Sequence, residues 1–148
     1  MDMTHILHTH FLGRKRVLLF EFEEGKKLYH LPWTVQSLVN FEKYYRGLDT
    51  SQYPALNYLR GYETIMEHGD TLFMPAGYWH HMEYIDSGMA LSLRAFDPKL
   101  TTKARGIYNL IGMRNIDTLM KKTMPDKWFN YKKNLALKNA SQAIAELV

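Results

Sequence analysis

The stretch between residues 61 and 96 is cut into short segments by turn-forming residues. His68-Gly69-Asp70, Pro75-Ala76-Gly77 and Asp86-Ser87-Gly88 stand between segments rich in apolar and β-branched residues. Turn signals spaced roughly eight to twelve residues apart are typical of antiparallel strands in sandwiches and barrels. This punctuation therefore predicts a mainly β fold for the first two thirds of the chain.

Five strands are predicted from the punctuation and from one apolar run nearer the start. They cover residues 17–22, 61–67, 71–74, 78–85 and 89–96. A closed barrel or a two-sheet sandwich usually has about seven or eight strands, so five strands would leave open edges. We therefore expect further strands to come from elsewhere, or the chain to be part of something longer.

The hydrophobic pattern changes after Asp97-Pro98 from strand-like alternation to helical spacing. Apolar residues fall on one helical stripe over residues 100–111, and further helices are predicted over residues 113–124 and 125–148. The expected fold is mainly β with C-terminal helices: a β domain over residues 1–97 and a helical extension over residues 98–148. This extension is too small for a core of its own, so we expect it to cover the sheet or to pair with a second copy.

Composition excludes cysteine-based sites and a membrane-spanning segment. The chain has no cysteine, which excludes disulfides and thiolate metal sites, and it has neither a signal-peptide pattern nor a membrane-length apolar run. We therefore expect a cytoplasmic protein without a membrane partner.

Residues 99–148 carry ten Lys and Arg against three Asp and Glu. Their helical spacing favours a solvated face, and nucleic-acid binding is the weaker alternative.

The residues Trp79-His80-His81 lie on a predicted strand, so the two histidine side chains must point to opposite faces. The segment GDTLFMPAGYWHHMEYIDSGMALSLRAF, residues 69–96, resembles the C-terminal strands of the JmjC-like cupins. These are iron(II)/2-oxoglutarate oxygenases that include protein asparaginyl hydroxylases. The resemblance implies a partial double-stranded β-helix, with His80 as the distal iron ligand and His81 on the opposite face.

A second segment, GRKRVLLF at residues 13–20, resembles the G-x-K-R strand of the same family. There the lysine binds the far carboxylate of 2-oxoglutarate, and the resemblance gives this role to Lys15. An ammonium group fixed at the end of a barrel strand suits a buried dicarboxylate. Tyr53-Pro54 and Gly61-Tyr62-Glu63 also match family positions, so the resemblance covers roughly residues 2–96.

The other iron ligands of the family come from an H-x-D pair whose aspartate lies eleven residues before the glycine of G-x-K-R. Counting back from Gly13 lands on Asp2, and the histidine of the pair would precede Met1. The resemblance therefore implies Asp2 and His80 as ligands and an upstream histidine as the third. Ile6 stands where several asparaginyl hydroxylases have an asparagine.

The histidines near the start of the chain are candidates to replace that ligand. If residues 2–11 are extended, His8 lies roughly 20 Å from Asp2 and His5 points to the other face. If they form a helical turn, an Asp2–His5–His80 site becomes conceivable. His8 and His10 are interpreted as polar residues that line the barrel or lie on the surface.

Two functions compete. The first is an iron(II)/2-oxoglutarate-dependent hydroxylase acting on a protein side chain, a small molecule or tRNA, in which Arg94 contacts substrate or co-substrate or forms a structural ion pair. The second is a catalytically incomplete cupin remnant that serves as a binding or dimerisation module. The C-terminal helices of the family often pair two subunits, and the resemblance implies such a homodimer contact here through Leu119, Met120, Trp128 and Tyr131.

Overall fold

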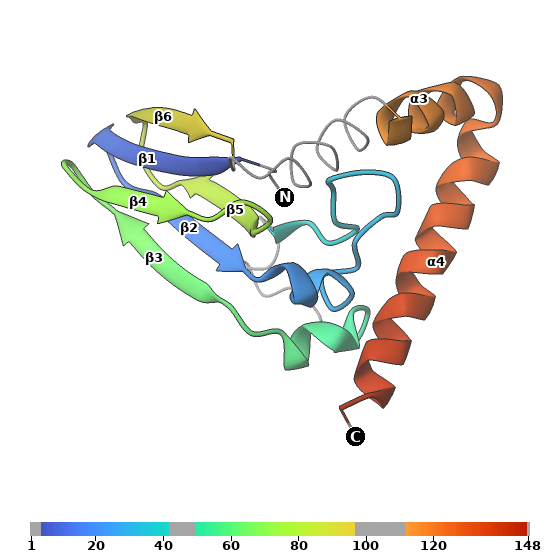
Figure 1. Ribbon diagram of the computed structural model, residues 1–148. Helices are drawn as coiled ribbons and strands as arrows, with labels where there is room; N and C mark the ends of the chain where they lie inside the picture. Colours follow the sequence, from blue (N-terminus) through green and yellow to red (C-terminus); the bar gives the residue numbers. More distant parts are fainter. Residues whose placement is uncertain (1–3, 42–49, 97–111, 148) are drawn as a thin grey trace. The chain divides into compact units, whose positions relative to one another are not determined.

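A computed structural model describes residues 4–41, 50–96 and 112–147 (Figure 1). The described residues form two compact units. The first contains the residues up to Phe22 and those from Arg60 to Phe96, and the second contains Glu23–Leu59 and the C-terminal helices. The helical stripe expected over residues 100–111 and the domain boundary expected at residues 97 and 98 lie outside the described residues.

The first unit consists of six antiparallel strands in two three-stranded sheets. Their order is β4-β1-β6 in one sheet and β3-β2-β5 in the other. The strands are β1 (His5–Leu12), β2 (Lys15–Phe20), β3 (Tyr62–Met66), β4 (Thr71–Met74), β5 (Trp79–Tyr84) and β6 (Met89–Ala95). Together with the C-terminal helices, these sheets confirm the predicted fold class.

Strand β1 was not among the five predicted strands. Its sequence HILHTHFL places His8 and His10 at the positions where a half-buried strand normally carries apolar residues. The other five strands agree with the predicted segments within two residues at either end. The turn residues and the apolar run therefore predicted five strands correctly, whereas the strand with a polar inner face was missed.

The core of the first unit lies between the inner faces of the two sheets. It contains Ile6 of β1, Val17 and Leu19 of β2, Met66 of β3 and Met74 of β4. Ile6 is directly paired with Met74, and directly paired residues of an antiparallel sheet point to the same face. This register identifies the inner face of every strand. β6, by contrast, is exposed at most of its positions.

Two turns pack closely at the end of the sheets, and both need glycine. Gly13, between β1 and β2, has a φ of 75°, and a Cβ atom there would overlap the carbonyl oxygen of Ser87. A Cβ atom at Gly88 would overlap the carbonyl oxygen of Leu12. The glycine that precedes Lys15 by two residues is thus required by both backbone conformation and space.

The second unit contains two 3-10 helical segments, η1 (Phe22–Gly25, beginning in the first unit) and η2 (Pro54–Tyr58), and two α-helices, α3 (Arg114–Thr123) and α4 (Pro125–Ala145). The two helices confirm those predicted over residues 113–124 and 125–148. Pro125 begins α4 because proline suits the first helical turn.

Asp117 joins α3 to α4 through a buried polar cluster. Its Oδ1 atom accepts hydrogen bonds from Trp128 Nε1 at 2.8 Å and from Lys132 Nζ at 2.6 Å, and its Oδ2 atom pairs with Lys121 Nζ at 2.6 Å. Burial raises the pKa of Asp117, but the hydrogen bonds from Lys121, Lys132 and Trp128 outweigh it and lower the pKa to about 2. The carboxylate is therefore ionised and holds the two helices together.

Candidate active site between the two sheets

His80 and His81 lie on opposite faces of β5, as strand alternation predicted. His80 is paired with Leu19 of β2, and His81 is paired with Leu18. Leu19 belongs to the core between the sheets, so His80 shares the inner face with it. His81 takes the outer face. The inward direction expected for His80 is confirmed, and its role as a metal ligand stays a prediction.

Lys15 also belongs to the inner face, at the start of β2. Only 1% of its surface is exposed, and Met66 of the same inner face is paired with it across the sheet. The Nζ atom lies 3.0 Å from His8 Nε2 and 4.1 Å from the centroid of the Tyr84 ring. No carboxylate of the described residues forms an ion pair with it. A buried ammonium group without a counter-charge is costly, so this position favours a bound anion.

His8 connects Lys15 to the opposite sheet. It is 4% exposed, and its Nδ1 atom lies 2.7 Å from Ser92 Oγ of β6. An ammonium group can only donate, so Nε2 must be the acceptor and Nδ1 carries the hydrogen that is donated to Ser92. Burial lowers the pKa of His8, and the positive charge of Lys15 and the nearby His10 and His80 rings lower it further. The imidazole is therefore neutral at neutral pH.

The remaining histidines of β1 alternate between the two faces. His10 is completely buried; its Nε2 atom donates to the carbonyl oxygen of Gly13 at 2.9 Å, and Nδ1 has no partner among the described residues. His8 and His10 thus line the interior, which was one of the two interpretations offered for them. No sequence pattern predicted the contact between His8 and Lys15.

His5 begins β1 on the outer face. Its ring stacks on Phe73 with 5.7 Å between centroids, and its Nδ1 atom accepts a hydrogen bond from the backbone of Ala76 at 3.1 Å. Ile6, the next residue, is the one that enters the core. The conceivable Asp2–His5–His80 site was therefore wrong in its second member, because His5 points away from the face that carries His80.

The other predicted site residues are placed only in part. Arg94 is paired with Ile6 and Ser92 with His8, so both side chains belong to the inner side of β6, where Arg94 is exposed. Asp2 lies outside the described residues. Within the described ranges, no group of three or more His, Cys, Asp or Glu side chains is arranged to hold a metal ion.

His80 and Lys15 lie at different positions along the inner face of the same sheet. On β2, the residues paired with His80 and with Tyr84 are Leu19 and Lys15, four positions apart. Four residues of strand correspond to about 13 Å between backbone positions.

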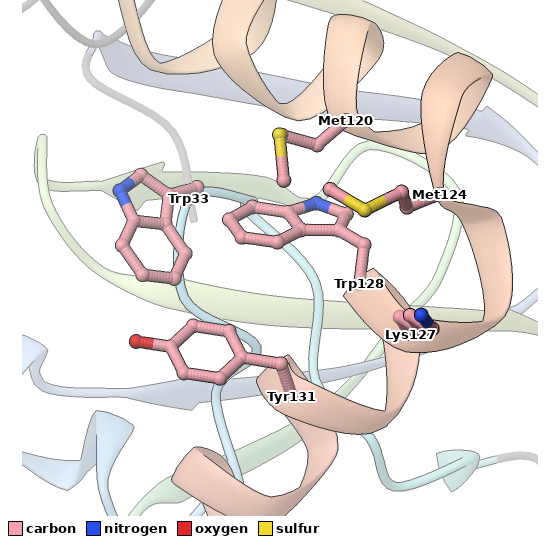
Figure 2. A pocket seen from close by; sticks show the side chains of 6 residues that line it. All are labelled: Trp33, Met120, Met124, Lys127, Trp128 and Tyr131. Atoms are coloured by element: carbon pink, nitrogen blue, oxygen red, sulfur yellow. The ribbon is translucent and has the colours of Figure 1, made fainter.

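The second unit has an open groove with a volume of about 400 Å³ (Figure 2). The ring of Trp33 lies 5.0 Å from that of Trp128 and 5.9 Å from that of Tyr131, measured between centroids. The lining residues are Trp33, Met120, Met124, Lys127, Trp128 and Tyr131. Three of the four residues predicted to form a dimer contact thus line this groove. Dimerisation itself stays a prediction.

Comparison with known proteins identifies the family. A protein-family model described as a cupin-like domain matches residues 1–96 of the sequence. The chain belongs to the cupin-like domain family. It is also 32% identical over 81 residues to the tRNA wybutosine-synthesizing protein 5 of Homo sapiens. That match covers 55% of this chain and 24% of the human protein, so the chain spans about a quarter of the length of this relative.

Neither α3 nor α4, nor any other helix of the described residues, is long and apolar enough to cross a membrane.

Proposed function

We propose that this cupin-like chain is the core of an iron(II)- and 2-oxoglutarate-dependent oxygenase that hydroxylates an unidentified substrate. The observation that carries the proposal is Lys15: an ammonium group that is 99% buried between the sheets and has no carboxylate partner among the described residues. Such a group gains a counter-ion when a dicarboxylate binds. His80 lies on the same inner face, about 13 Å away along the sheet.

The co-substrate fits the residues that are present. We assign the far carboxylate of 2-oxoglutarate to Lys15, which donates a charge-assisted hydrogen bond to it. The apolar core beside Lys15, formed by Val17 and Met66, keeps water away and so strengthens this interaction. Arg94, on the exposed part of the inner side of β6, is proposed to contact the substrate or the co-substrate.

The metal is assigned to His80 and Asp2, with a further ligand to complete the two-histidine, one-carboxylate set typical of non-haem iron oxygenases. The described residues contribute only His80 to that set. Bound iron(II) would allow oxygen to act as the oxidant, with 2-oxoglutarate as the electron-donating co-substrate, and His80 would fix the position of the metal relative to Lys15.

A second candidate function is a binding or dimerisation module without catalysis. The observation in its favour is the apolar surface of the C-terminal helices, where Leu119 is 61% exposed and Tyr131 is 51% exposed. Large exposed apolar side chains gathered on one helical pair often mark a contact surface. On this reading Lys15 would bind an anion without turnover.

An assay for the conversion of 2-oxoglutarate to succinate and CO2 distinguishes the two functions. The reaction is measured with iron(II) and oxygen, for this chain and for the same reading frame extended upstream. The proposal predicts iron-dependent turnover in at least one of them, and loss of that turnover in Lys15→Met. Absence of turnover in both proteins, with a dimer detected by light scattering, would favour the module instead.

A further inference from the structure

We propose that His8 is a positioning residue for the co-substrate: with Ser92, it fixes the direction of the Lys15 ammonium group through a chain of hydrogen bonds that joins the two sheets. The inference rests on the proposed function, because it takes 2-oxoglutarate to be the anion that Lys15 binds. It adds two residues, His8 and Ser92, that neither the sequence motifs nor the family resemblance assigned.

The chain of hydrogen bonds has a defined direction. Lys15 Nζ donates to His8 Nε2 over 3.0 Å, and His8 Nδ1 donates to Ser92 Oγ over 2.7 Å. Lys15 is on β2, whereas His8 and Ser92 are paired neighbours on β1 and β6. The lysine stem is therefore held by one sheet and its charged end by the other.

This arrangement is needed because a lysine side chain has no preferred direction of its own. Its stem is flexible and its three hydrogens rotate freely, unlike the rigid guanidinium fork of arginine. In this protein one hydrogen is directed at His8, and the face of the Tyr84 ring lies 4.1 Å from the nitrogen on another side. With these two contacts occupied, the remaining donor capacity is left for a carboxylate.

Ser92 completes the chain at the second nitrogen of His8. Lys15 can only donate, so Nε2 of the neutral ring accepts, and Ser92 Oγ, which as a hydroxyl can accept, takes the hydrogen on Nδ1. Metal-binding histidines are oriented in the same way by the partner of their second nitrogen. Here the principle applies to a histidine that orients an ammonium group.

Two substitutions at one position test this role. In His8→Gln the amide reaches the place of Nε2, so an acceptor for Lys15 is kept and the Ser92 contact is lost. In His8→Asn the amide reaches only the place of Nδ1, so the Ser92 contact is kept and the acceptor for Lys15 is lost. Dissociation constants for 2-oxoglutarate are measured by titration calorimetry on the whole chain with manganese(II), which does not require turnover.

The proposal predicts that His8→Asn weakens 2-oxoglutarate binding roughly tenfold or more, the value of one charge-assisted hydrogen bond. His8→Gln should stay within about threefold of wild type. Ser92→Ala, at an exposed position where folding is not at risk, should weaken binding by an intermediate factor. A purely structural role for His8 would not separate Asn from Gln in this order.

A spectroscopic measurement examines the chain of hydrogen bonds from Lys15 through His8 to Ser92 without any ligand. Nitrogen-15 NMR of the His8 ring should show the neutral form with hydrogen on Nδ1, and Lys15→Met should remove this preference. Wild-type affinity in both His8 variants, or equal loss in both, would overturn the positioning role and leave the proposed function standing. Failure of the wild-type chain to bind 2-oxoglutarate at all would instead overturn the proposed function, and the inference with it.

Discussion

Lys15 Nζ and His8 Nε2 lie 3.0 Å apart, although the two residues belong to different sheets. The pair gives the interior of the first unit a positive charge that a neutral imidazole orients but cannot balance. Lys132 in the second unit is equally buried, at 2% exposure, but its Nζ atom lies 2.6 Å from Asp117. We therefore expect Lys132 to raise the free energy of unfolding, and Lys15 to leave it unchanged or to lower it.

Replacing each lysine by methionine should reveal this difference. Lys15→Met removes an unbalanced buried charge and keeps the side-chain volume, so the free energy of unfolding should be unchanged or higher by about 1 kcal/mol. Lys132→Met leaves Asp117 with one partner fewer and should lower it by about 2 kcal/mol or more. Urea denaturation of the two variants measures both values. A large destabilisation by Lys15→Met would mean that Lys15 is structural.

Acid should weaken the helical unit through Asp117. Its folded-state pKa of about 2 lies below the ordinary value of 3.8, so its contribution is fully present above pH 4 and is lost as the pH falls towards 2. A difference of this size corresponds to about 2 kcal/mol. The measurement is the difference in unfolding free energy between wild type and Asp117→Asn at pH 6 and at pH 2.5, which should shrink on acidification.

Asp126, exposed in the first turn of α4, provides the matched control. Asp126→Asn should keep the acid-dependent loss of stability, because the Asp117 cluster is intact. If Asp117→Asn and wild type lose stability in parallel over this pH range, the depressed pKa assigned to Asp117 is wrong.

The glycine of the G-x-K-R segment should be more sensitive to substitution than a glycine of similar backbone conformation. Gly13 and Gly69 both have positive φ, at 75° and 91°, but only Gly13 is crowded, by Ser87. Gly69→Ala should cost about 1 kcal/mol for the left-handed backbone alone. Gly13→Ala should cost at least about 1 kcal/mol more, because Ser87 must also move. Equal melting temperatures for the two variants would contradict the close packing of these turns.

The sequence predicted those parts of the fold that depend on local patterns. Turn residues located β3 to β6, and helical spacing with Pro125 located α3 and α4. Alternation placed His80 and His81 on opposite faces, and the family resemblance made His80 the inward one. β1 was missed because two of its inner positions, His8 and His10, are histidines, and a polar inner face resembles a surface segment. Strand patterns therefore fail where polar side chains lie inside the fold.

The relation between His8 and Lys15 could not be read from local patterns. It depends on β1 pairing with β6, which brings Ser92 beside His8 from 84 residues away, and on the two sheets facing each other. Lys15 itself was identified through a motif, and its burial followed only from the structure. Asp2, predicted as a metal ligand, lies outside the described residues and stays a prediction.

The most direct test of the central claim compares the two adjacent histidines of β5. His80→Ala and His81→Ala are assayed side by side for iron-dependent conversion of 2-oxoglutarate to succinate, in whichever form of the protein is active. Because only His80 faces the interior that holds Lys15, we predict loss of turnover in His80→Ala and near wild-type turnover in His81→Ala. Full turnover in His80→Ala, or loss confined to His81→Ala, would contradict an active site between the two sheets.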